Sequence, residues 1–308
     1  MQSIIPPVER KALEAEFTRD KFIRTTNKGD NEIYIVTHHD SPNLMREIGR
    51  LRELTFREAG GGTGEEIDID EYDIADIPYK QLIVWDPQEK ELVGGYRYIC
   101  GKDVKKDEKG SVHLAVSELF NFSNKFVNEY LPYTIELGRS FVQPKFQPSS
   151  ENRKGLFSLD NLWDGLGALI VDYKDIKYFY GKVTMYTHYN ANARNMILYF
   201  MNYYFPDKEK LVYPFKPLMI KSDPKEFEPL FKGLNYKEGH MVLNQNVRNL
   251  GENIPPLVNS YMNTSPTMKT FGTAINEHFG GVEETGILVT IKDIYPTKKE
   301  RHVSSYKK

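Results

Sequence analysis

The chain has 308 residues, of which 40% are hydrophobic and 27% charged, with 20 Tyr and 17 Phe. This length and balance predict a single globular domain with a sizeable core, and the aromatic surplus suits either a thick core or an apolar pocket. The formal net charge of −2 argues against nucleic acid as a partner of the whole chain. Because Cys100 is the single cysteine, the sequence excludes an intrachain disulfide and a cysteine-rich metal site. We expect no metal.

No run approaches the roughly 18 apolar residues of a membrane span, and no apolar N-terminal segment follows a basic start. We therefore expect a cytoplasmic protein. The basic C-terminal stretch PTKKERHVSSYKK allows at most a peripheral contact with the inner face of the membrane.

Residues 1–40 are mixed and polar, and we expect an N-terminal arm with one short helix and the strand EIYIVT. In SPNLMREIGRLRELTFREA, Ser41 can cap a helix, Pro42 suits its first turn, and apolar residues repeat at helical spacing. This stretch predicts a helix. The segments QLIVWD and ELVGGYRYIC flank PQEK and predict a β-hairpin.

A helix near residues 115–129 and the strand YTIELGRSFV are expected next. Ser158 can cap a helix through LDNLWDGLGALIVDY. Further strands are predicted at KYFYGKVTMY, FGTAINEH and GILVTIK, and further helices at NANARNMILYFMNYYF and IPPLVNSYM. Strands and helices that alternate without repeats predict an α/β or α+β sheet with helices packed on it.

The stretch FREAGGGTGEEIDIDEYD places four glycines beside a group of carboxylates. A P-loop would need Lys followed by Ser or Thr after the glycines, the dinucleotide fingerprint also fails, and the carboxylates would repel phosphate. A calcium loop is a better rival, but Tyr72 occupies the third ligand position and no glycine occupies the sixth. We interpret the glycines as the flexible part of a lid over a site.

Three charged residues lie in or beside apolar segments. Arg52 borders the apolar stripe of the first long helix, Arg97 shares the strand parity of its apolar neighbours, and Glu136 interrupts a strand three residues before Arg139. Buried charges cost several kcal/mol unless they are paired. The pattern therefore predicts an ion-pair cluster with the DIDEYD segment, structural or functional. A bulge at Gly138 would turn the last two side chains toward one cleft and free backbone N–H groups for an oxyanion.

In chain order, RELTF, the glycine-rich loop, DIDEYD, LIVWD, LVGGYRYI, ELGRSFVQP and LWDGLGALI resemble the bacterial N-acyltransferases of ornithine-lipid and glycine-lipid synthesis. These GNAT-superfamily enzymes are often labelled haemolysin-like. The resemblance implies a mixed, mostly antiparallel central sheet with a splayed, bulged central strand and helices on both faces. It places the acyltransferase domain at residues 41–308, with an insertion around 187–250.

Acyl-homoserine-lactone synthases, which are related GNAT enzymes, carry a similar set of residues. The resemblance implies that Glu136 is the base, directly or through a water, and that Arg97 or Arg139 binds the acceptor carboxylate. Backbone N–H groups near Gly138 would hold the oxyanion. The complete implied set is Arg52, Phe56, Asp70, Asp73 and Arg97 for substrate binding, and Glu136, Gly138, Arg139 and Ser140 for catalysis.

The usual GNAT coenzyme A loop, [QR]-x-x-G-x-[GA], is not present in SSENRKGLFSLD. This departure favours acyl carrier protein over coenzyme A as the acyl donor, since its acidic surface can meet basic side chains. No tightly bound cofactor is expected. The implied residues on the donor side are Phe141, Val142, Lys145, Arg153, Lys154 and Gly155.

The resemblance predicts transfer of a long, possibly 3-hydroxylated acyl chain from a carrier-protein thioester to the α-amine of a small amino acid, glycine or ornithine. Three alternatives stay open. They are an acyl-homoserine-lactone-type synthase, a coenzyme A-dependent acetyltransferase, and a non-catalytic lipid-binding or membrane-binding protein.

Overall fold

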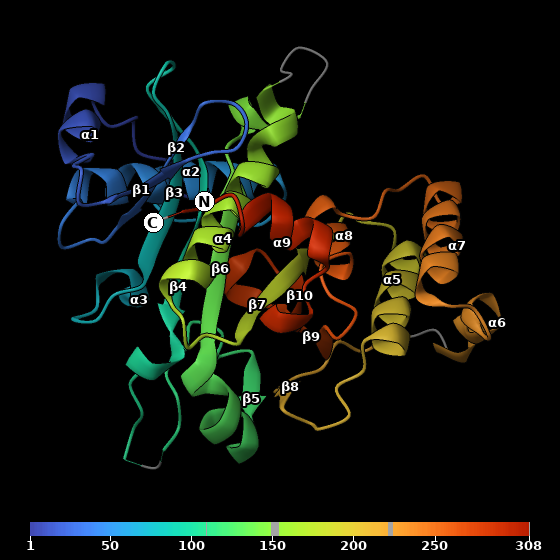
Figure 1. The fold of residues 1–308 in the computed structure, drawn as a ribbon. Coiled ribbons are helices and arrows are strands. Elements are labelled where there is room, and N and C mark those ends of the chain that lie inside the picture. The colour runs from blue at the N-terminus through green and yellow to red at the C-terminus, as the bar shows by residue number, and fades with distance from the viewer. Residues whose placement is uncertain (109, 149–153, 221–223, 308) are drawn as a thin grey trace.

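The computed structural model describes residues 1–108, 110–148, 154–220 and 224–307. An eight-stranded sheet with the order β1-β2-β3-β4-β6-β7-β10-β9 runs through the molecule (Figure 1). Its described neighbours pair antiparallel except β6 and β7, which are parallel. Strands β5 and β8 form a small second sheet. The expected mixed, mostly antiparallel sheet is confirmed.

The strands have the following bounds: β1 Phe22–Thr25, β2 Glu32–Val36, β3 Lys80–Asp86, β4 Glu91–Cys100, β5 Phe120–Phe122, β6 Thr134–Val142, β7 Tyr178–Met185, β8 Val212–Pro214, β9 Lys269–Asn276 and β10 Val282–Thr290. The α-helices are α1 Arg10–Glu16, α2 Pro42–Glu58, α3 Glu71–Ile74, α4 Ser158–Asp172, α5 Ala191–Tyr204, α6 Glu228–Phe231, α7 Tyr236–Asn249, α8 Pro256–Met262 and α9 Pro296–His302.

Helices cover both faces of the large sheet, as expected. In Figure 1, α4 and α9 lie on one side of it and α2 on the other. The core under α4 continues into α8, α5 and α7, whose apolar side chains join the same cluster. The opposite face is shared between α2 at one end and the segment 101–133 at the other, which pack as two smaller cores.

Helix α2 confirms the first predicted helix. Pro42 occupies its first turn, and Leu44, Ile48 and Leu51 are buried against the sheet. The expected cap is wrong, because the Ser41 side chain makes no capping hydrogen bond and donates instead to Asp40.

Three other segments differ from the sequence predictions. Residues 115–129 form turns, β5 and the start of a π-helical segment rather than a helix. Residues 1–40 do more than form an arm, because β1 and β2 extend the main sheet. Helix α7 was not predicted, although Asn235 and Glu238 form a capping box at its start, which is a pattern visible in the sequence.

Candidate functional site

The site lies where β6 bulges and separates from β7. Arg97 of β4 pairs with Gly138 and Gly95 pairs with Phe141, so β6 carries one extra residue at this point. Arg139 lies in the bulge with φ of 47°, in the left-handed region that L-residues seldom occupy. The bulge expected at Gly138 is therefore present one residue later.

The pairing of β6 with β7 ends at Glu136 and Tyr180. Beyond this point the backbone groups of β6 that face β7 have no partner strand, which produces the expected splay. Gly181 lies close to β6, since a Cβ there would come within 2.8 Å of the Leu137 carbonyl oxygen.

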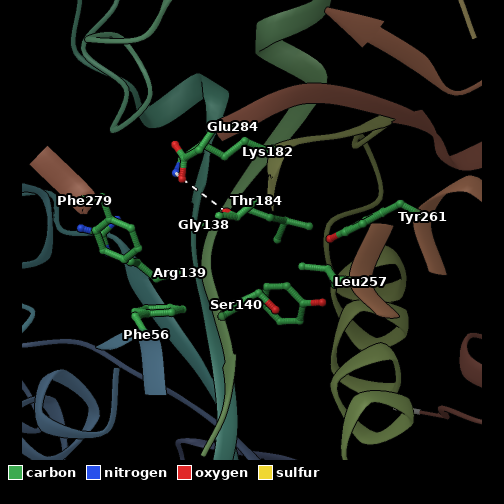
Figure 2. Close-up of a pocket in the computed structure, with 13 residues that line it drawn as sticks. Phe56, Gly138, Arg139, Ser140, Lys182, Thr184, Leu257, Tyr261, Phe279 and Glu284 are labelled. Atoms are coloured by element: carbon green, nitrogen blue, oxygen red, sulfur yellow. Dashed lines mark hydrogen bonds and ion pairs between the residues drawn. The ribbon is translucent and has the colours of Figure 1, made fainter. Parts of the chain in front are cut away.

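A small cavity of about 50 Å³ lies in the gap between the two strands. Figure 2 shows Arg139, Lys182 and Glu284 on one side of it and Leu257 and Tyr261 on the other. The cavity is thus charged at one end and mainly apolar at the other. The remaining lining residues are Phe56, Tyr96, Leu137, Gly138, Ser140, Gly181, Thr184 and Phe279.

The predicted ion-pair cluster is present next to this cavity. Arg52 Nη1 lies 3.1 Å from Asp73 Oδ2, and Arg97 Nη1 lies 2.7 Å from Asp70 Oδ2 and 3.2 Å from Asp73 Oδ2. Gln81 joins the cluster, since it accepts from Arg52 and donates to Asp73 over 2.9 Å. Neither arginine lines the cavity.

Helix α3 presents both aspartates of the cluster to the arginines. Asp70 is its N-cap, and together with Asp73 it forms a capping box. Burial alone would raise the pKa of Asp73, but Arg52 and Arg97 lower it to about 2. The carboxylate therefore stays ionised in the interior.

Arg139 pairs with an aspartate that the sequence analysis did not single out. Its Nε lies 2.9 Å from Asp68 Oδ2, and its guanidinium lies 4.4 Å from the centroid of the Phe279 ring. Asp68 is fully buried. The DIDEYD stretch marked its neighbourhood, but the sequence does not distinguish Asp68 from the other acidic residues nearby.

Glu136 is fully buried and does not line the cavity. The Tyr79 hydroxyl donates to Glu136 Oε2 and accepts from the Ala115 N–H over 3.0 Å. Among the described residues, Glu136 Oε1 has no hydrogen-bond partner. Burial raises the pKa of Glu136, which makes the carboxylate a better proton acceptor.

A second buried pair was missed by the sequence analysis. Lys182 of β7 donates to Glu284 of β10, which also accepts from Thr184 over 3.4 Å and from Asn276 over 3.2 Å. Burial lowers the pKa of Lys182. The lysine interrupts the apolar strand KYFYGKVTMY in the same way that Glu136 interrupts its own strand, so the same signal could have found it.

Comparison with known proteins shows the family to which the chain belongs. A family model described as an acetyltransferase (GNAT) domain matches residues 51–153. A protein of Phocaeicola vulgatus named glycine N(alpha)-acyltransferase is 56% identical over 308 residues, which cover 100% of this chain and 94% of that protein. The chain belongs to this GNAT acyltransferase family. It is accordingly an enzyme that transfers an acyl group to the amine of an amino acid.

A second relative of the acyltransferase, from Bacteroides thetaiotaomicron, bears the same name and is 55% identical over 306 residues, or 99% of this chain and 91% of that one. The solved structure of BjaI, a CoA-dependent acyl-homoserine lactone synthase, is 13% identical and covers 88% of this chain and 86% of its own. Its TM-score is 0.38. None of the helices in the described residues of the acyltransferase has the length and apolar character needed to cross a bilayer.

The glycine-rich segment of the acyltransferase is attached to α2 by hydrogen bonds. Glu53 is fully buried and accepts hydrogen bonds from the N–H groups of Thr63 and Gly64, over 3.0 Å and 2.8 Å. Burial alone would raise the pKa of Glu53, but these bonds and one from Arg57 hold it below its ordinary value. An ionised anchor therefore fixes the turn that the sequence analysis interpreted as a flexible lid.

The donor-side residues predicted for the acyltransferase do not converge on the cavity. Phe141 is buried in the core under α2, and Val142 packs against the opposite core. Lys145 is half exposed and lies 3.0 Å from Glu91. Gly155 is buried where a Cβ would come within 2.5 Å of the Gln147 carbonyl oxygen. Of the other two predicted residues, Arg153 lies outside the described residues, and Lys154 begins a 3-10 helix.

Proposed function

We propose that the protein transfers a long fatty acyl chain from a thioester donor to the α-amine of glycine. The observation that carries this proposal is the 56% identity, over the whole chain, to a protein named glycine N(alpha)-acyltransferase. The cavity between β6 and β7 supports it, because a charged end suits an amino acid and an apolar end suits a fatty acyl chain.

An amine attacks a thioester only in its unprotonated form, so the reaction needs a proton acceptor. We assign this role to Glu136, acting through a water, because its carboxylate does not line the cavity. The amine nitrogen then bonds to the thioester carbon, and backbone N–H groups between Gly138 and Phe141 hold the developing oxyanion. The C–S bond breaks as the oxyanion collapses, and the thiolate leaves and takes up a proton.

Acyl carrier protein is the donor we favour. Its acidic surface would meet Lys145, Arg153 and Lys154, which follow the bulged strand in the sequence. Coenzyme A remains the rival donor. The purified enzyme, given the same acyl chain on carrier protein and on coenzyme A, distinguishes the two donors by the ratio of their kcat/KM values.

Mass spectrometry of lipids from a heterologous host tests the reaction. Cells that express the chain should accumulate an acyl-glycine series. Glu136→Gln should reduce this series by about 10²- to 10⁴-fold, the usual contribution of a general base. Glu129→Gln, which alters an exposed carboxylate, serves as the matched control.

Two outcomes would contradict the proposal. An acyl-ornithine series in place of acyl-glycine would correct the acceptor and keep the reaction. A lipid profile unchanged by soluble, folded protein would overturn both.

A further inference from the structure

A buried ion pair faces the charged end of the cavity. The side chains of Lys182 and Glu284 are 13% and 1% exposed. Removing two charges from water costs about as much as their attraction returns, so such a pair seldom adds stability. The pair lies on the cavity wall (Figure 2), so we expect it to contact a ligand bound in the cavity.

Three arginines near the cavity form ion pairs with protein carboxylates. Arg52 and Arg97 do not line the cavity, and they bind the aspartates of α3 and its N-cap. Arg139 does line it, but its Nε binds Asp68 and its guanidinium lies over the Phe279 ring. These contacts orient the guanidinium toward the protein.

Lys182 has spare hydrogen-bonding capacity at the cavity wall. An ammonium group has three donors, and within the described chain Glu284 is its one hydrogen-bond acceptor. Glu284 is in turn held from β7 by Thr184 and from β9 by Asn276. Lys182 is therefore fixed in place with N–H donors left for a ligand, and the ion pair need not break to bind one.

We propose that Lys182 binds the carboxylate of the amino acid acceptor and that Glu284 is the positioning residue that holds Lys182 toward the cavity. This inference rests on the proposed function, because it names the group that recognises the acceptor at the same site. A carboxylate bound to Lys182 keeps the α-amine one carbon away. The amine then remains at the gap between the strands, where Gly138 and the bulge line the same cavity.

The test compares two acceptors that differ in one charge. Glycinamide keeps the α-amine of glycine but lacks its carboxylate. Purified wild-type enzyme and Lys182→Met are each assayed with both acceptors and the same acyl donor. The ratio of kcat/KM for glycine to that for glycinamide should fall by about 10- to 100-fold in the variant, the usual effect of losing a hydrogen bond to a charged group.

Three further variants make the result specific. Lys182→Arg keeps the positive charge and should retain part of the preference for glycine. Lys174→Met, which alters an exposed lysine between α4 and β7, should leave the ratio unchanged. Because Lys182→Met leaves Glu284 buried without its cation, the double variant Lys182→Met/Glu284→Gln provides a neutral pair that folds without an unpaired charge.

The outcomes separate this inference from the proposed function. Equal losses with glycine and glycinamide in the folded double variant would overturn the role of Lys182 and leave the proposed function intact. If the wild-type enzyme acylates ornithine and not glycine, the proposed acceptor is wrong. The same ratio, measured with ornithine and ornithinamide, then decides the role of Lys182.

Discussion

Asp73 is the residue on which the buried arginine cluster depends. Its carboxylate contacts both Arg52 and Arg97, and all three side chains are almost fully buried. Asp73→Asn should therefore lower the free energy of unfolding by about 3–5 kcal/mol, since it leaves buried charges without their partner. Chemical denaturation measures the loss. Asp76→Asn, at a residue whose side chain is 95% exposed, should change stability by less than about 0.5 kcal/mol.

The same carboxylate gives the protein a defined sensitivity to acid. The pKa of Asp73 is lowered from an ordinary 3.8 to about 2, so its contribution to stability is complete above pH 3.8 and is lost as the pH falls toward 2. Between these values the wild-type protein should lose stability more steeply than Asp73→Asn. Parallel slopes for the two proteins in denaturation series at pH 4, 3 and 2.5 would contradict this assignment.

At the residue scale, the sequence revealed which side chains are unusual but not which partners they take. A charge inside an apolar repeat is visible without a structure, and this signal identified Arg52, Arg97 and Glu136. The same signal is present at Lys182, which lies within an apolar strand, but this residue was not among the predicted site residues. The pairing of Arg139 with Asp68 could not be deduced, because a strand bulge with positive φ redirects the arginine and the acidic segment offers several equivalent carboxylates.

At the element scale, Glu53 of α2 controls the glycine-rich turn. Glu53→Gln removes the negative charge that Thr63, Gly64 and Arg57 share, and a hydrogen bond to a charged group contributes about 1.5–3 kcal/mol. Limited proteolysis should therefore cut between Gly60 and Gly64 at least about tenfold faster in the variant than in the wild type, which should resist cleavage.

The control for this prediction is Glu58→Gln, an exposed change on the same helix. It should leave the cleavage rate at the wild-type value. Rapid cleavage of the wild-type turn would show instead that the segment opens freely and that Glu53 does not fasten it.

Elements with a strong local pattern were predicted well, and those that depend on distant partners were not. The β3–β4 hairpin and the helices α2, α4 and α5 follow from periodicity and turn residues within one short stretch. The strand β5 forms because it pairs with β8, about ninety residues later in the chain. A local sequence pattern does not indicate such a distant pairing partner. The aromatic residues of β5 therefore fitted a helix equally well in the sequence.

At the scale of the whole molecule, the sheet separates a charged environment on one face from an apolar environment on the other, and the two meet in the gap between β6 and β7. Charged side chains of the α2 face and apolar side chains of α8 reach the same cavity because β6 and β7 diverge. We expect the amino acid to occupy the charged end and the acyl chain to extend toward Leu257 and Tyr261. The specificity for each substrate would then be set by a different face of the sheet.

Leu257→Trp tests this division. A larger side chain at the apolar end should shorten the preferred acyl chain while the amino acid specificity stays the same. Each methylene that loses apolar burial costs about 0.8 kcal/mol, or about fourfold in relative kcat/KM for successive chain lengths. Met241→Trp on α7, where the wild-type side chain is 58% exposed, should leave the chain-length profile of the lipid products unchanged. If Leu257→Trp lowers the rate equally for every chain length, the acyl chain takes another route, because a blocked channel penalises long chains first.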